Sequence, residues 1–256
     1  VPPFVRNGEN NGAWFQGRRL VVQNEDTMQL EAHTWIRNFE DLIAFPVPKP
    51  KSPEESLECL APRPGFKVEL VAAEPEVESP IAFEWDAAGK LWVVEMRDYP
   101  LGMDGKGKPG GRIKVLTDED ADGRYEKAVT FATDLPYPTG IFPSGDGVIV
   151  AAAPDILFLA DNDGDGRADE RRVLFTGFRP GNQQHRMNGF EWGLDGWVYG
   201  ANGDSGGKIR AVQNRGEQKE VNISGRDFRF RADGSAFEAE SGQVQFGRRR
   251  DDWGNW

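Results

Sequence analysis

A motif that recurs four times along the chain constrains its fold more than any other feature. In each copy a small residue is followed seven positions later by a glycine that closes an acidic or polar turn. Successive copies are 58, 49 and 58 residues apart. Periods of this size are typical of solenoids, propellers and arrays, and the strand-forming residues between the turns favour the propeller. The four pairs are Ala82 and Gly89, Gly140 and Gly147, Gly189 and Gly196, and Gly247 and Gly254.

The composition agrees with an all-β fold and excludes several classes of protein. The 256 residues include 31 glycines and 17 prolines, and no long segment places apolar residues at helical spacing. No run of about 18 apolar residues predicts a membrane span. The single cysteine, Cys59, provides neither an internal disulfide nor a C-x-x-C-H haem site. The net charge of −11 repels phosphate backbones, so we expect no nucleic-acid partner.

Each repeat unit predicts one propeller blade, a four-stranded antiparallel meander. Inner strands are buried on both faces and therefore apolar, whereas outer strands alternate apolar and polar residues. In a meander, the loops between strands two and three lie at the same end as the blade-to-blade connections. The predicted strands are 80–85, 91–95, 112–116 and 127–131 in the first unit, 140–143, 148–152, 156–159 and 171–175 in the second, and 189–192, 197–201, 228–231 and 237–239 in the third.

Three regions follow from this pattern. Residues 1–45 form an N-terminal segment of unknown fold, in which 17–22 predicts a strand. Residues 46–64 form a linker, because their alternating prolines favour an extended polyproline segment. Residues 65–256 form a partial β-propeller, for which we expect three blades and the start of a fourth, out of six in the full protein. We expect such an open ring to expose apolar blade faces and to aggregate.

Two acidic loops, each joining a third strand to a fourth strand, predict calcium sites. Alternate carboxylates followed by a glycine form the opening of a calcium loop, but neither loop has the Glu at position 12 that an EF-hand needs. Glu126, Asp169 or Glu170 is available to complete a shorter cage. The alternative is a solvated hairpin turn rich in Asp and Gly. The predicted ligands are Asp118, Asp120 and Asp122 in the first loop and Asp161, Asp163 and Asp165 in the second.

A second group of polar residues lies at the opposite end of the blades, and we call this end the mouth. His185 enters the third unit there, and imidazole can act as a general base near neutral pH. The alternative is an ordinary surface-loop histidine, with the other residues tying neighbouring blades together. The predicted binding residues are Glu95, Arg97, Asp98, Arg186, Asn188, Asn202 and Asp204.

Several long motifs resemble the planctomycete proteins known as membrane-bound dehydrogenases, a haem-binding C-x-x-C-H protein family. The resemblance covers roughly Ser52 to Trp256 and is carried by residues 65–75, 92–100, 185–204 and 245–255. It implies a propeller similar to that of the glucose and sorbosone dehydrogenases that use pyrroloquinoline quinone. It also implies a periplasmic or extracytoplasmic location, and a cytochrome module elsewhere in the full-length chain as a partner.

The resemblance to the soluble quinone dehydrogenases can be carried over at one histidine. There, a histidine precedes an Asp turn by ten positions, ahead of a strand that ends in Gly-Asp. Here His185 precedes Asp195 by ten, and Gly203-Asp204 follows, although Asn188 stands where the family has glycine. The resemblance implies that His185 takes the proton of a sugar hydroxyl while hydride passes to the quinone. The family's Arg and Lys contacts to the cofactor come from later blades.

Three functions remain open at this point. The first is a quinone-dependent sugar or aldehyde oxidoreductase. The second is a calcium-containing, lactonase-type hydrolase with Glu95, Asp155 and Asp204 as acidic ligands in the channel. The third is a non-catalytic propeller that binds carbohydrate or a partner, because propellers host all of these functions.

Overall fold

The computed structural model describes residues 50–212 and 220–256, together with strands at 14–16, 19–23 and 30–35. The chain divides into two units, residues 1–61 and 62–256. In the first unit β1 (Trp14–Gln16), β2 (Arg19–Gln23) and β3 (Leu30–Trp35) form an antiparallel sheet. The strand predicted at 17–22 corresponds to β2, while much of the 1–45 segment lies outside the described residues.

A short helix lies inside the predicted linker. Helix α2 (Pro53–Leu57) begins at Ser52, whose side chain accepts a hydrogen bond from the backbone of Glu55. The Glu55 carboxylate in turn accepts a 2.9 Å hydrogen bond from the backbone N–H of Ser52, which completes a capping box. Proline at the first helical position is compatible with this start, since its missing N–H has no intrahelical partner there.

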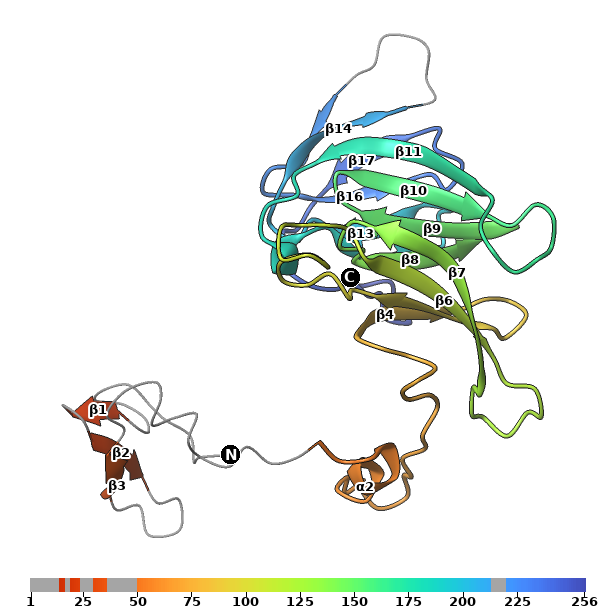
Figure 1. Ribbon diagram of the computed structural model, residues 1–256. Helices are drawn as coiled ribbons and strands as arrows, with labels where there is room; N and C mark the ends of the chain where they lie inside the picture. Colours follow the sequence, from red (N-terminus) through yellow and green to blue (C-terminus); the bar gives the residue numbers. More distant parts are fainter. Residues whose placement is uncertain (1–13, 17–18, 24–29, 36–49, 213–219) are drawn as a thin grey trace. The chain divides into compact units, whose positions relative to one another are not determined.

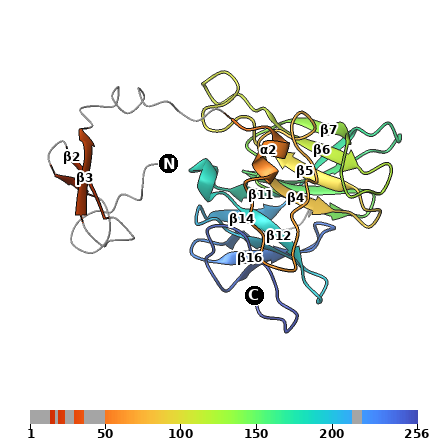
Figure 2. The ribbon, with the colours of Figure 1, turned by 90° about the horizontal axis from the view of Figure 1, so that it is seen from below.

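The described part of the second unit folds into three antiparallel sheets, and this confirms the predicted all-β, propeller-like fold. In Figures 1 and 2 the second sheet lies between the first and the third. The first sheet contains β4 (Pro80–Trp85), β5 (Leu91–Glu95), β6 (Gly111–Thr117) and β7 (Lys127–Leu135). The second contains β8 (Gly140–Ser144), β9 (Gly147–Ala152), β10 (Asp155–Ala160) and β11 (Glu170–Phe178), and the third contains β12 (Asn188–Trp192), β13 (Val198–Ala201), β16 (Asp227–Phe230) and β17 (Phe237–Glu240).

Alternation along the inner strands produces two cores, one on each face of the second sheet. On β9, Val148 and Val150 pack toward the first sheet with Trp92 and Val94. Ile149 and Ala151 pack toward the third sheet, in a cluster that includes Phe228. Every residue of β5, β9 and β13 is buried, as expected for strands covered on both faces.

The small residues of the repeat lie where the first strands of neighbouring blades approach each other. A Cβ atom on Gly140 would lie 3.5 Å from the backbone nitrogen of Gly189. A Cβ atom on Gly189 would lie only 2.7 Å from the Cα of Gly247, and Gly189 has a φ of +61°. A larger side chain at Gly189 would therefore collide with backbone, which explains why the motif places a small residue here.

Two strands were not predicted from the sequence. The segment between β13 and β16 contributes β14 (Gly207–Ala211) and β15 (Val221–Asn222), which extend the second sheet beyond β11. Phe175 pairs with Ala211 across the new edge. The repeat gives no signal for this insertion, because the first two units have no counterpart and Lys208 and Arg210 make β14 polar on one face.

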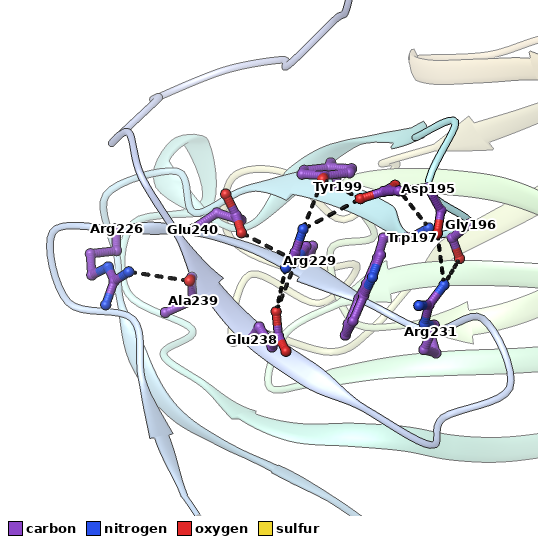
Figure 3. A network of polar contacts seen from close by, with 10 residues as sticks. All are labelled: Asp195, Gly196, Trp197, Tyr199, Arg226, Arg229, Arg231, Glu238, Ala239 and Glu240. Atoms are coloured by element: carbon purple, nitrogen blue, oxygen red, sulfur yellow. Dashed lines mark hydrogen bonds and ion pairs between the residues drawn. The ribbon is translucent and has the colours of Figure 1, made fainter. Parts of the chain in front are cut away.

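The face of the third sheet that points away from the second sheet carries charged side chains (Figure 3). The expectation that the open blade faces are apolar is therefore wrong for this face. Arg229 lies 4.6 Å from the ring of Trp197 and donates a 2.6 Å hydrogen bond to Glu238. Arg231 lies on the same ring at 4.2 Å. Charged groups held by such cation–π contacts and ion pairs make this face compatible with exposure to solvent. On the first sheet Phe83 and Trp85 are exposed, as the expectation required.

Within the described residues, no helix has the length and apolar character needed to cross a membrane.

We predict that Phe228→Ala lowers the free energy of unfolding by about 3–5 kcal/mol, because truncating a buried aromatic leaves a cavity. The Phe228 ring is fully buried and lies within 5.2 to 6.4 Å of four other phenylalanine rings. Chemical denaturation provides the measurement. Phe66→Ala, at a side chain that is 74% exposed, serves as the control and should change stability by less than about 0.5 kcal/mol. Equal losses in both variants would contradict the assigned core.

Candidate functional site at the mouth of the blades

Hydrogen bonds bring loops from all three sheets together at the mouth. Asp98, after β5, accepts a 2.8 Å hydrogen bond from the backbone of Tyr137, between β7 and β8. Gln184, in the short 3-10 helix η1 (Gln183–His185), donates a 2.7 Å bond to the hydroxyl of Tyr99. Gly203, after β13, donates to Val244, after β17. The loops that the meander predicted to share one end therefore do so.

Glu95 is fully buried and surrounded by partners from its own sheet. One carboxylate oxygen accepts a 2.7 Å bond from the backbone of Glu78, and the other accepts a bond from Arg112. Lys114 Nζ lies 3.6 Å from the first oxygen. With both oxygens in use, Glu95 holds the entry to β4 against β5 and β6.

Asn188 and Asn202 also hold the loops of the mouth. Asn188, 1% exposed, donates to the carbonyl oxygens of Arg186 and Gln245 and accepts a 2.7 Å bond from Gly247. Asn202, equally buried, accepts from Gly206 and donates to a backbone carbonyl. Asn188 therefore joins the start of the third blade to the segment that follows its last strand.

His185 and Asp204 form a dyad at the mouth. Nδ1 of His185 lies 3.0 and 2.9 Å from the two carboxylate oxygens of Asp204. Because a carboxylate only accepts hydrogen bonds, Nδ1 carries the proton and donates it. Nε2 lies 3.3 Å from the amide nitrogen of Gln245, which fits an unprotonated Nε2. The imidazole and carboxylate side chains are 31% and 42% exposed, so the dyad is open to ligands.

The backbone around the dyad is strained. Asp204 has a φ of +63°, and Ser79, Asp134 and Tyr137 also adopt positive φ. Such residues cost free energy and cluster at functional sites. Ser79, Tyr137 and Asp204 lie in three different connecting segments, and Asp134 lies near the end of β7.

Arg97 and Arg186, the other predicted binding residues, border a pocket of about 430 Å³. Arg97 is partly exposed and lies 3.3 Å from Glu78. Arg186 is only 6% exposed, and burial lowers the pKa of its guanidinium while the negative charge of Asp98 opposes that shift. One oxygen of Asp98 is itself buried with no hydrogen-bond partner among the described residues.

The two acidic loops share one hydrogen-bond pattern at the end of the blades opposite the mouth; in Figure 1 both extend to the right, away from η1. In the second loop Asp161 accepts bonds from the backbones of Gly164 and Gly166, and these N–H groups lower its pKa, with Gly166 the larger cause. Asp118 accepts the equivalent bonds from Ala121 and Gly123.

Each loop also gathers three carboxylates whose nearest oxygens lie within 4.8 Å of one another. The members are Asp118, Asp120 and Glu126 in the first loop, and Asp161, Asp163 and Asp169 in the second. Asp122 and Asp165 stand outside these groups; instead each accepts a hydrogen bond from a backbone N–H two residues ahead. Glu126 and Asp169, which the sequence offered to complete the cage, are therefore members of these groups in place of Asp122 and Asp165.

Residues 52–256 match the protein family described as Domain of unknown function (DUF7133). The chain belongs to this family. No curated protein matches it. The DUF7133 family description assigns no activity, so function must be argued from the site.

Three solved structures show distant likeness to this DUF7133 chain. A nidogen/laminin complex is 14% identical over 64% of this chain and 66% of that chain, with a TM-score of 0.35. A luciferin-regenerating enzyme is 12% identical over 64% and 59%, with a TM-score of 0.36. A protein assigned as a 6-phosphogluconolactonase from Bacteroides uniformis is 11% identical over 94% and 66%, with a TM-score of 0.35. The chain thus spans about two thirds or less of their lengths, and likeness at this level carries no argument about its activity.

We predict that Glu95→Ala destabilises the fold by about 3–5 kcal/mol, because it removes the buried carboxylate beside Arg112 and Lys114 and leaves these cations with only Glu78 and two backbone carbonyls as partners. Chemical denaturation of this variant and of Glu74→Ala, an exposed control, provides the measurement. A ligand-binding role for Glu95 would instead leave stability unchanged and affect only binding.

Proposed function

We propose that the mouth is the general-base site of an oxidoreductase that acts on a sugar hydroxyl or an aldehyde. The observation that carries the proposal is the His185–Asp204 dyad. Asp204 fixes the Nδ1–H tautomer, so the lone pair of Nε2 points away from Asp204 and can accept a proton. As Nε2 takes the hydroxyl proton, the negative charge of Asp204 stabilises the imidazolium that forms. Gln245 occupies the place beside Nε2 that a substrate hydroxyl would take.

Oxidation also requires an acceptor for the hydride that leaves the carbon as the carbonyl forms. The family resemblance points to pyrroloquinoline quinone, which supplies this acceptor when bound. In the resembling dehydrogenases the cofactor's Arg and Lys contacts come from later blades. What the described residues of this chain contribute is therefore the base and its orienting carboxylate, and the periplasmic location and cytochrome partner rest on the resemblance alone.

We predict that His185→Ala lowers sugar-dependent dye reduction in the quinone-loaded protein by about 10²–10⁴-fold, the usual contribution of a positioned base. Quinone binding should survive, since the variant removes only the base. Asp204→Asn should also lower turnover, because an amide can no longer fix the Nδ1–H tautomer; Asp252→Asn, at an exposed carboxylate, is the matched control. Unchanged turnover in His185→Ala would contradict the proposal.

The hydrolase alternative has less support from the geometry. Glu95 is paired with Arg112 and Lys114, and Asp155 accepts a 2.5 Å bond from Thr176. Asp204 is engaged by His185. Within the described residues, the groups of three metal-ligating carboxylates lie in the acidic loops and not among these three. Lactone hydrolysis by a protein that binds no quinone would nevertheless favour the hydrolase.

We further propose that the two acidic loops bind calcium in a structural role. Carboxylate oxygens are the ligands that calcium prefers, and each loop presents three of them in close proximity on a fixed turn. The loops lie at the end opposite the dyad, so a bound ion would stabilise the hairpins without taking part in the reaction.

We predict that calcium raises the melting temperature and that a chelator reverses the effect. A ligand that binds only the folded state at about 100 times its Kd stabilises by about 2.7 kcal/mol. Asp163→Ala should lose most of the contribution of its loop, whereas Asp165→Ala, from the same loop but outside the cluster, should retain more of it. Identical wild-type melting curves with calcium and with chelator would contradict the claim.

A further inference from the structure

A pocket at the mouth has a donor set that the general-base mechanism does not use. Its volume is about 430 Å³, and it lies between the loop that follows β5 and the helix η1. Met96 and Ile81 provide apolar walls, and the exposed rings of Tyr99 and Phe246 provide aromatic ones. Because Gln184 and Phe246 line it and are the chain neighbours of His185 and Gln245, the pocket adjoins the dyad.

Arg186 is a buried cation with no ion pair within 4 Å among the described residues. Its Nε donates a 2.8 Å bond to the carbonyl of Pro180, and its guanidinium lies 4.8 Å from the centre of the Tyr137 ring. These two contacts fix the plane of the guanidinium, while its two terminal nitrogens make no hydrogen bond to described residues. The negative charge of Asp98 acts on the guanidinium from beyond ion-pair distance and offsets only part of the cost of burying this cation. A buried charge is costly unless it is paired, so the site favours an incoming anion.

The shape of this donor favours a carboxylate. A guanidinium presents its N–H groups as a planar fork, which matches the two oxygens of a carboxylate in a bidentate pair. Arg97 lies on the same pocket and adds positive charge, although Glu78 partly neutralises it.

The remaining polar groups suit hydroxyls. Gln183 and Gln184 use their amide nitrogens on Pro100 and Tyr99, so their carbonyl oxygens remain available as acceptors. The Tyr99 hydroxyl accepts the bond from Gln184, which leaves its own proton free to donate. Aromatic rings beside such groups also suit the C–H face of a sugar ring.

We propose that this pocket, which we name the Arg186 pocket, binds the carboxylate of a sugar acid and so makes carboxylated sugars the substrate class of the mouth. The proposal deepens the proposed function and rests on it for the reaction, but binding can be tested without turnover. Arg186 is a binding residue that orients the sugar acid, and the neighbouring dyad would act on one of its hydroxyls.

The first test varies only the ligand. Calorimetric titration of the quinone-free chain with D-glucuronate, D-glucuronamide and D-glucose compares one sugar frame with and without a carboxylate. A charged hydrogen-bonded pair predicts about 10- to 100-fold tighter binding of glucuronate than of the neutral amide. Raising the salt concentration should narrow this difference, because ions screen the attraction. Equal affinity for the acid and the amide, or no binding of either, would overturn the proposal.

The second test varies Arg186. Arg186→Gln should abolish the preference for glucuronate, and Arg186→Lys should restore part of it, because lysine keeps the charge but not the fork. Arg179→Gln, at an exposed arginine nearby in the chain, should leave the preference unchanged. Melting curves establish that each variant folds, and the comparison of acid with amide within each variant is independent of its stability.

A third arm separates the sugar acid from the cofactor, which also carries carboxylates. If saturating pyrroloquinoline quinone leaves glucuronate binding intact, the pocket serves the substrate. If quinone displaces glucuronate, the pocket serves the cofactor and the proposal is overturned. If His185→Ala leaves dye reduction unchanged and the protein still binds glucuronate more tightly than the amide, the proposed reaction is contradicted but the Arg186 pocket is not.

Discussion

Three buried carboxylates determine the structure of the mouth. Glu95 and Asp227 are fully buried, and Asp98 is 1% exposed. Each accepts hydrogen bonds from backbone N–H groups of other segments: Glu95 from Glu78, Asp98 from Gly110 and Tyr137, and Asp227 from Asn202 and Val244. These partners compensate for the loss of water at every carboxylate oxygen named here except one oxygen of Asp98, which has no partner among the described residues. A movement of these loops would leave more buried charge uncompensated, which is costly.

This constraint lets a few half-exposed groups hold fixed positions on connecting loops. Asp227 anchors the backbone of Asn202, two residues before Asp204. Ser205 donates to the carbonyl of His185, so the two segments of the dyad are joined on both sides of Asp204. Asp98 anchors Tyr137, whose ring supports the guanidinium of Arg186. Groups held in this way lose little entropy when they engage a ligand, which favours both binding and proton transfer.

The sequence predicted the blade strands because their signal is periodic and local. Apolar inner strands and recurring Asp-Gly turns do not depend on distant residues, and β5, β9 and β13 lie where the pattern placed them. Local patterns did not predict β14, because this strand pairs with β11 of the preceding blade. Nothing within residues 207–211 indicates that pairing. At the mouth, the sequence identified which loops converge, because the meander fixes the end at which each loop lies.

The sequence could not separate the roles of the polar residues within those loops. Glu95 and Arg97 are two positions apart, and the sequence predicted both as binding residues. In the structure Glu95 is the last residue of β5 and is fully buried against Arg112, whereas Arg97 follows the strand and borders the pocket. Gln245 gave no signal by itself, because its proximity to His185 arises from a segment 60 residues away in the chain. These distinctions depend on burial and partners, which only the folded structure supplies.

The tautomer of His185 tests the account most directly, because both the proton-accepting role and the geometry of the mouth depend on it. Nitrogen-15 NMR of the two histidine rings, with His33→Gln to assign them, distinguishes a protonated Nδ1 from a protonated Nε2. The dyad predicts that Nδ1 carries a proton in the wild type, and that this preference is lost in Asp204→Asn. A wild-type ring with its proton on Nε2, or a tautomer ratio that Asp204→Asn does not change, would contradict the account.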